Sequence, residues 1–130
     1  MTLNTQLEAL FDGIKAKAPP PVIAKALATF ERLEAAHVGQ MAPKPGDKAP
    51  DVHLTAMDHT RSSLKDLVAI GPIILMFYRG RWCPFCDLTL KAFDQQAGAF
   101  NAAGARLIAI SPQTVEESQK TAAERSLSFQ

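Results

Sequence analysis

The chain has 130 residues, of which 47% are apolar and 21% are charged, and its formal net charge is +1. This length allows one compact domain with a core and is too short for two. A near-neutral balance without a cluster of basic residues excludes a general attraction to nucleic acid or to an anionic membrane. The longest apolar stretch, residues 67–78, is interrupted by Gly71-Pro72 and is too short to span a bilayer. We therefore expect neither nucleic acid nor a membrane as a partner.

The start of the chain and its cysteine content indicate the compartment. The first residues carry neither a basic start nor an apolar run, which argues against a secretory signal. The only two cysteines, Cys83 and Cys86, are three positions apart and so cannot staple a small secreted domain. We expect a soluble protein of the cytoplasm.

Residues 1–41 predict an N-terminal helical hairpin. Thr5 and Glu8 have the spacing of a capping box, in which each side chain bonds a free backbone N–H at the helix start. Two apolar stripes at helical spacing follow, and the proline run 19–21 separates them, since Pro ends one helix and is tolerated in the first turn of the next. Gly39 suits the end of the second helix. The stripes consist of Leu7, Leu10, Phe11 and Ile14, and then Ile23, Leu27, Phe30 and Leu33.

A connector rich in Pro and Gly, residues 42–50, leads into the remainder of the chain. Residues 51–55 alternate between polar and apolar as an edge strand does, and residues 58–61 have the composition of a turn. Ser63 and Asp66 then have the spacing that caps a short helix.

The segment after this helix alternates between strands and helices. Residues 73–78 form a continuous apolar run, which is typical of a strand buried on both faces. A helix over about 84–103, a buried strand over 106–110 and a helix over about 114–125 follow, and residues 127–130 resemble the entry to a further strand. Strand–helix–strand–helix order predicts a right-handed βαβ unit with a mainly parallel sheet.

The two cysteines come directly after the 73–78 strand, at the carboxyl edge where sites form in parallel sheets. With Cys83 as the N-cap and Pro84 as the first helical residue, free backbone N–H groups and the helix dipole face the Cys83 sulfur. Both effects stabilise the thiolate and lower its pKa. Arg79 and Arg81 are close enough in sequence to add positive potential, although both are equally compatible with ordinary solvated charges.

Cys86 lies one helical turn after Cys83 and on the same face, so the two can form a reversible disulfide. Trp82 packs beside this pair. Two structural cysteines are the alternative, as is half of a zinc site. The available histidines, His37, His53 and His59, are not paired at ligand spacing, and we expect no metal and no cofactor.

Several separated segments resemble the alkyl hydroperoxide reductase/thiol-specific antioxidant family, the peroxiredoxins. They are residues 49–54, 63–67, 74–78 and 107–112, and the resemblance extends over about 44–130. It implies an α/β, thioredoxin-like fold for residues 42–130. It also implies reduction of hydroperoxides by a reactive cysteine, with a thioredoxin-like protein or a small thiol as reductant.

The segment around the cysteines departs from the family pattern of Pro, Thr four positions later and the peroxidatic Cys three beyond. Counted without gaps, Arg79 stands in place of the Pro, Cys83 in place of the Thr, and Cys86 at the peroxidatic position. Residues 82–86, Trp-Cys-Pro-Phe-Cys, are instead similar to the thioredoxin motif. The family match favours Cys86 as nucleophile. An N-cap sulfur is expected to be more exposed and to face more N–H groups, and for that reason we predict Cys83 as nucleophile and Cys86 as resolving thiol.

The resemblance also implies further strands, a helix, a peroxide-binding Arg and a cis-Pro that this sequence does not contain, so we expect an incomplete sheet. We expect a homo-oligomer, because the strand at 106–110 would have an open edge and the N-terminal helices have apolar stripes. The strand, the helices or both should lie at the interface. Two other functions stay open: a general thiol–disulfide oxidoreductase without peroxidase activity, and a non-catalytic interaction protein with an inert redox domain.

Overall fold

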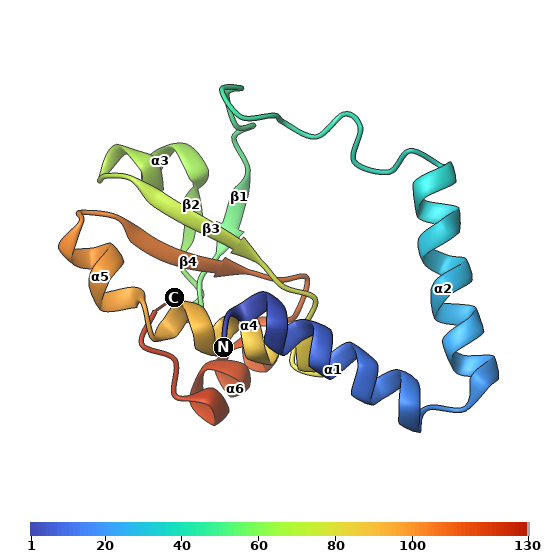
Figure 1. The fold of residues 1–130 in the computed structure, drawn as a ribbon. Helices are drawn as coiled ribbons and strands as arrows, with labels where there is room; N and C mark the ends of the chain where they lie inside the picture. The colour runs from blue at the N-terminus through green and yellow to red at the C-terminus, as the bar shows by residue number, and fades with distance from the viewer. Residues whose placement is uncertain (130) are drawn as a thin grey trace. The chain divides into compact units, whose positions relative to one another are not determined.

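The computed structural model describes residues 1–129 of the chain. Its contacts divide the chain into two units, Met1–Ala49 and Pro50–Gln130, and Figure 1 shows the elements of each. Within residues 1–129, no helix has the length and apolar character needed to cross a membrane.

Helix α1 (Leu3–Lys17) begins earlier than the sequence predicts. Its N-cap is Thr2, whose hydroxyl accepts a hydrogen bond from the Thr5 backbone N–H at 3.3 Å. The predicted capping box at Thr5 and Glu8 is therefore wrong, because Thr2 is an equally good capping residue one turn upstream.

Helix α2 (Pro20–Ala35) begins within the proline run, as predicted, with Pro19 as its N-cap and Pro20 and Pro21 in its first turn. It ends at Ala35 instead of near Gly39, because the backbone already turns left-handed at His37 with a φ of 53°. None of the described residues of α1 or α2 is buried, and the apolar stripe of α2 is open to solvent, with Phe30 56% exposed.

The second unit opens with an antiparallel pair, β1 (His53–Thr55) and β2 (Arg61–Ser63). The sequence predicts β1 and the turn but not β2, because Arg61-Ser62-Ser63 contains no apolar residue that could alternate with polar ones. Ser63 ends β2 and also caps α3 (Leu64–Ala69) through the predicted capping box with Asp66, which is confirmed.

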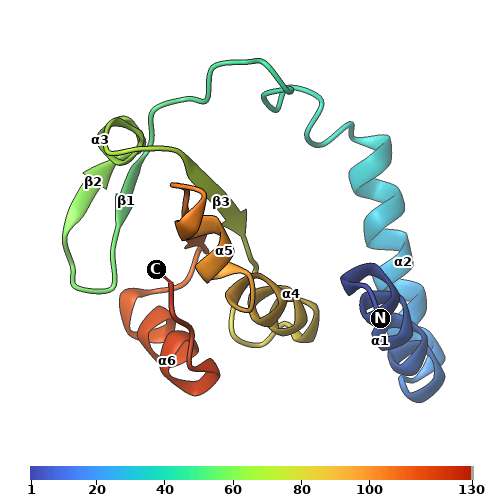
Figure 2. The ribbon, with the colours of Figure 1, turned by 60° about the vertical axis from the view of Figure 1, so that its left-hand side comes forward.

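Strands β3 (Ile73–Phe77) and β4 (Arg106–Ile110) pair in parallel along their full length, so the predicted βαβ unit is confirmed. Met76, Leu90 and Leu107 form the buried core between this pair and the helices that follow β3. Those helices, α4 (Pro84–Asp94) and α5 (Ala97–Ala102), cover one face of the pair (Figure 2).

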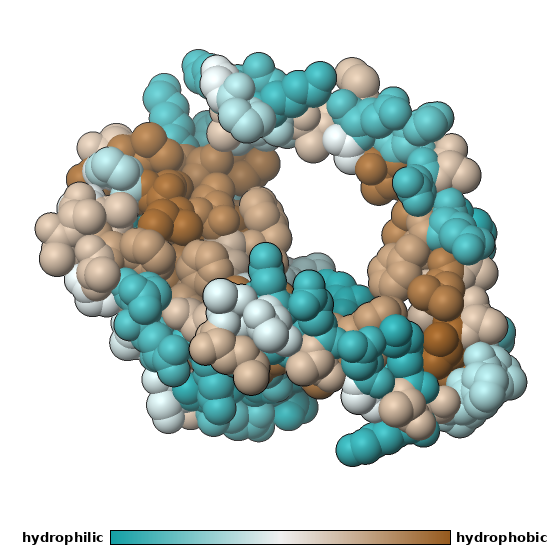
Figure 3. Space-filling view, viewed as in Figure 1, coloured by the Kyte–Doolittle hydropathy of each residue, from teal (hydrophilic) through white to brown (hydrophobic). Residues whose placement is uncertain are grey.

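Part of the opposite face of the β3–β4 pair is uncovered, although Leu75, Ile108 and Ile110 on that face are half-buried. Phe77 is 74% exposed and Ile70, just before β3, is 73% exposed. Figure 3 shows apolar residues gathered over β3 in this unit. The prediction of burial on both faces is therefore wrong, because an unbroken apolar run gives the composition of both faces but not what packs against them.

The predicted helix over 84–103 is two helices in the structure. Gln96 interrupts it with a φ of −102° and a ψ of −3°, and the chain then turns into α5. This turn buries Ala97 and brings the Phe93 and Phe100 rings to 6.2 Å between centroids. The sequence has no Pro or Gly at Gln96 itself, and Gly98 two positions later is a weak signal for the end of a helix.

Helix α6 (Val115–Arg125) has the predicted N-cap, Thr114, and ends at Ser126, which has a left-handed φ of 51°. The expected strand entry at 127–130 is wrong for residues 127–129, which form no strand. Leu127 and Phe129 pack against the core instead. The last position of that prediction, Gln130, lies outside the described residues.

Candidate active site

A short loop after β3, residues 79–82, leads the chain to the first cysteine. Gly80 in this loop is buried and has a φ of 145°, a conformation that side chains disfavour. A Cβ atom there would lie 2.9 Å from Trp82 Nε1 and 3.0 Å from Gln113 Oε1. The loop therefore requires Gly80 both for its backbone angle and for the space around it.

Cys83 occupies the predicted N-cap of α4, with Pro84 as the first helical residue. Its sulfur accepts a hydrogen bond from the Cys86 backbone N–H at 3.4 Å. The Arg79 guanidinium donates to the same sulfur through Nη2 at 3.0 Å and lies over the Trp82 ring at 5.0 Å from its centroid. The helix start and Arg79 thus converge on one sulfur atom.

Cys86 lies within the first turn of α4, and its sulfur accepts a hydrogen bond from the Arg79 backbone N–H at 3.3 Å. Both cysteines are free thiols in this structure. The structure therefore brings Cys83, Cys86, Arg79, Trp82 and Pro84 together at the start of one helix.

The two thiols differ in their electrostatics. Burial raises the pKa of Cys83, but hydrogen bonds from Cys86 and from the positively charged Arg79 outweigh it and hold that pKa below its usual value. Burial, and after it the neighbouring Cys83, raises the pKa of Cys86. Cys83 is therefore the thiol that ionises first, as expected for an N-cap sulfur.

The burial of the two sulfurs differs from the expectation. Cys83 is 0% exposed and Cys86 is 9% exposed, so the prediction that Cys83 is the more exposed thiol is wrong. The sequence pattern placed the sulfur at the helix start but not the Arg79 guanidinium that lies against it. Cys83 is therefore closed to solvent in this structure.

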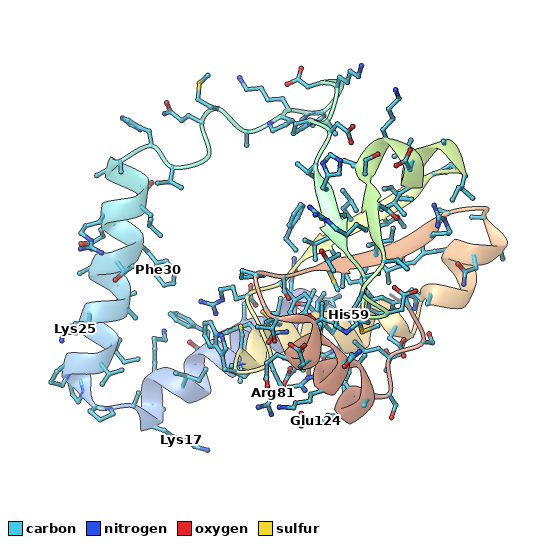
Figure 4. All side chains as sticks on the ribbon, turned by 180° about the vertical axis from the view of Figure 1, so that it is seen from behind. Lys17, Lys25, Phe30, His59, Arg81 and Glu124 are labelled. Carbon is cyan, nitrogen blue, oxygen red and sulfur yellow. The ribbon has the colours of Figure 1, made fainter. Side chains whose placement is uncertain are left out.

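Arg81 points to a different partner. Its guanidinium pairs with Glu117 at 3.0 Å and Glu124 at 3.3 Å, both on α6, and Figure 4 labels Arg81 and Glu124 at this contact. Arg125 of α6 donates to the Arg81 carbonyl at 2.9 Å and pairs with Asp87 of α4. The Arg81 side chain therefore ties the loop to α6 instead of adding its charge beside the sulfurs.

The sequence analysis missed Gln113 and the α6 residues that contact the loop. Gln113 accepts a hydrogen bond from the Arg81 backbone N–H at 2.6 Å. A signal for it existed, because Gln113 follows β4 just as the cysteine loop follows β3, and parallel strands end at the same edge of a sheet.

No metal centre is found among residues 1–129, where no three His, Cys, Asp or Glu side chains gather closely enough to hold an ion. A cavity of about 380 Å³ lies between the β1–β2 hairpin, β4 and α6, and its lining includes Tyr78 and Gln113. Neither Cys83 nor Cys86 is part of that lining.

Comparison with known proteins gives a family match and several similar structures. The family model described as AhpC/TSA matches residues 45–130. Peroxidoxin BcpB from Mycobacterium tuberculosis is 28% identical with a TM-score of 0.59, over 64% of this chain and 54% of that one. Peroxiredoxin Q from Xanthomonas campestris is 22% identical with a TM-score of 0.54, over 60% of this chain and 49% of that one.

A yeast mitochondrial 1-Cys peroxiredoxin is similar in fold, with 18% identity and a TM-score of 0.57, over 64% of this chain and 42% of that one. The chain thus spans about half of the length of the solved structures that it matches. No curated protein matches the sequence. The thioredoxin-like, mixed α/β fold expected from the sequence is confirmed by these neighbours.

Proposed function

Since this chain belongs to the AhpC/TSA family, we propose that it reduces hydroperoxides by thiol chemistry, with Cys83 as the nucleophile and Cys86 as the resolving thiol. The observation that carries the proposal is the convergence of the α4 N-terminus and the Arg79 guanidinium on the Cys83 sulfur. A thiolate is the reactive form of cysteine, and this arrangement favours it at Cys83.

In the first step the Cys83 thiolate attacks the terminal oxygen of the hydroperoxide. The O–O bond breaks, an S–O bond forms, and the departing alkoxide takes a proton and leaves as an alcohol. The sulfur loses two electrons to the peroxide and becomes a sulfenic acid. Arg79 is placed to stabilise negative charge near the reacting sulfur.

In the second step the Cys86 sulfur attacks the Cys83 sulfenic acid. An S–S bond forms, the S–O bond breaks, and the hydroxide released takes a proton to become water. Two electrons and two protons from an external thiol reductant then restore both thiols. The position of Cys86 one turn into the same helix suits this role.

Single substitutions separate the two roles. After brief exposure to a hydroperoxide, Cys86→Ser should accumulate a sulfenic acid on Cys83, because the resolving thiol is gone. Cys83→Ser should react slowly, because burial, the largest cause of the raised Cys86 pKa, remains in this variant. Mass spectrometry with a sulfenic-acid trapping reagent measures both.

The double variant Cys83→Ser/Cys86→Ser is the control and should take up no oxygen on either position. A sulfenic acid that forms rapidly on Cys86 in Cys83→Ser, with none on Cys83 in Cys86→Ser, would reverse the assignment. The family spacing would then outweigh the electrostatics of the helix start.

A general thiol–disulfide oxidoreductase is the second candidate. The observation in its favour is that Cys83 stands where the family pattern has Thr, within the Trp-Cys-Pro-Phe-Cys segment at the start of α4. Reduction of a model disulfide without consumption of hydroperoxide would support this function over the first.

A further inference from the structure

Two side chains from outside hold the backbone of the loop that carries Arg79 and Arg81: Arg125 bonds the Arg81 carbonyl at 2.9 Å, and Gln113 bonds the Arg81 N–H. The Gln113 Oε1 atom accepts a hydrogen bond from the Arg81 backbone N–H at 2.6 Å. Its Nε2 atom donates to the Tyr78 hydroxyl at 3.1 Å and to the Thr121 hydroxyl at 3.3 Å. Gln113 therefore joins the end of β3, the loop and helix α6 through a single amide group.

We propose that Gln113 is a positioning residue for the thiol chemistry, which fixes the loop so that Arg79 is held on the Cys83 sulfur. The inference rests on the proposed function, because it assigns Gln113 a role only through the reactivity of Cys83. Gln113 itself acts through Arg81 and does not need to touch the substrate.

The amide is suited to this position because it offers an acceptor and a donor at opposite ends of one planar group. The Arg81 N–H needs an acceptor, and the Tyr78 and Thr121 hydroxyls both accept from Nε2. The Thr121 hydroxyl is anchored in turn, since it is buried and donates to the Glu117 carbonyl at 2.7 Å. An apolar side chain of the same length would leave all three groups without this partner.

The loop needs such a brace because its flexible residue lies next to Arg79. Gly80 separates Arg79 from Arg81, and a glycine with a φ of 145° has many other conformations open to it. Gly80 lies between two backbone hydrogen bonds that restrict it. The Arg81 N–H bonds Gln113 on one side, and the Arg79 N–H bonds the Cys86 sulfur on the other. The Arg79 guanidinium is then kept 3.0 Å from the Cys83 sulfur.

The ion pairs of Arg81 do not replace this brace. Its side chain is 41% exposed, and Glu117 and Glu124 are 36% and 51% exposed, so solvent screens both pairs. They also hold the end of a long flexible side chain, whereas Gln113 and Arg125 bond the loop backbone itself, and of the two only Gln113 bonds the Arg81 N–H.

The test is the pH profile of Cys83 alkylation by iodoacetamide in the Cys86→Ser protein, with and without Gln113→Leu. Adding Gln113→Leu should move the pH profile of alkylation to higher pH and slow alkylation at pH 7 about three- to tenfold. This is the range expected when the single hydrogen bond from Arg79 to the Cys83 sulfur is lost. The matched control is Gln119→Leu on α6, which loses a single bond to the Met57 carbonyl and should leave the profile unchanged.

Each outcome bears on a stated part of the inference. If Gln113→Leu lowers the midpoint of urea unfolding but leaves the profile in place, Gln113 is structural only and the inference is overturned. If Cys83 titrates as an ordinary thiol even with Gln113 present, the proposed nucleophile fails, and the inference fails with it. If Gln113→Leu does not fold, Tyr78→Phe takes its place, because it removes one partner of the Gln113 amide. It should move the pH profile of Cys83 alkylation to higher pH by a smaller amount. An unchanged pH profile in Tyr78→Phe also overturns the inference.

Discussion

After Cys86, whose hydrogen bonds lower the pKa of Cys83 most, Arg79 is the charged side chain that bears on the proposed reactivity of Cys83. Its guanidinium bonds the Cys83 sulfur, its backbone N–H bonds the Cys86 sulfur, and its face lies over the Trp82 ring. A charged donor stabilises a thiolate more than a thiol, so Arg79 lowers the pKa of Cys83. Arg81, two residues later, has its charge paired with α6.

Replacing Arg79 by Met should therefore slow the alkylation of Cys83 at pH 7 about fivefold, a value that allows for the partial exposure of this side chain. Iodoacetamide alkylation in the Cys86→Ser protein measures the effect. Arg81→Met is the matched comparison and should change the rate much less, because only its side chain is lost and the loop backbone keeps its bond to Gln113. Equal effects of the two substitutions would contradict the specific role of Arg79.

The lowered pKa of Cys83 also predicts how stability depends on pH. Below the pKa that Cys83 has in the folded protein, its thiol is protonated in both the folded and the unfolded chain and adds nothing to the free energy of unfolding. Above about 8.5, the ordinary pKa of a cysteine in an unfolded chain, the thiol is ionised in both, and its stabilising contribution is complete. Cys86→Ser loses the Cys86 side chain, but the backbone N–H of residue 86 and the Arg79 guanidinium still bond the Cys83 sulfur, so its free energy of unfolding should rise with pH across this window. Urea unfolding measures it, and the double variant Cys83→Ser/Cys86→Ser should lack the rise.

At the scale of elements, the loop between β3 and α4 is the most constrained connection near the site. A Cβ at Gly80 would meet Trp82 and Gln113, and the φ of 145° disfavours any side chain.

Gly80→Ala should therefore destabilise the protein by about 1–3 kcal/mol in chemical denaturation. Gly98→Ala is the matched control, because Gly98 lies in helix α5 with nothing within 4 Å of an added Cβ. That change should be neutral or stabilising by about 0.5–1 kcal/mol. A Gly80→Ala protein as stable as the Gly98→Ala protein would show that the loop is not constrained as described.

Elements whose signals are local could be predicted from the sequence. The caps at Ser63, Cys83 and Thr114 are confirmed, because each depends on residues within one helical turn. The parallel pairing of β3 and β4 is confirmed as well, since strand–helix–strand order leaves few alternatives.

Features that depend on distant contacts could not be predicted in the same way. The break at Gln96 goes together with packing of Phe93 on Phe100, and Gly98 is only a weak local sign of it. The Arg79 guanidinium folds back onto the Cys83 sulfur, and Gln113 bonds the backbone of Arg81 from 32 positions along the chain. The cysteine pair could be predicted from residue types and spacing, but the side chains that contact the pair and its loop could not.

At the scale of the whole molecule, much apolar surface is open to solvent in both units. In the first unit it lies on α2, and in the second it lies on and beside the partly uncovered face of β3. The exposed residues are Val22, Leu27, Phe30 and Leu33 in α2, and Val68, Ile70 and Phe77 in the second unit. Surface of this kind is typical of an interface, and we keep the proposal that the chain forms a homo-oligomer.

Light scattering at micromolar concentration tests this proposal, and the measured mass should be at least twice that of one chain. Phe30→Gln should shift the mass toward the monomer if the helices form the interface, because it removes the most exposed ring of the α2 stripe. Thr29→Gln, an exposed position beside it, is the control and should leave the mass unchanged. A wild-type protein that is monomeric would contradict the proposal.

The most direct test of the proposed chemistry is the intact mass of the wild-type protein after treatment with a stoichiometric amount of hydroperoxide. We expect the loss of two hydrogens, with Cys83 and Cys86 joined in a disulfide that a dithiol reductant reverses. A mass that does not change, with both thiols still open to alkylation after denaturation, would contradict the account, because a thiolate stabilised by Arg79 and the α4 N-terminus would then not react with the peroxide.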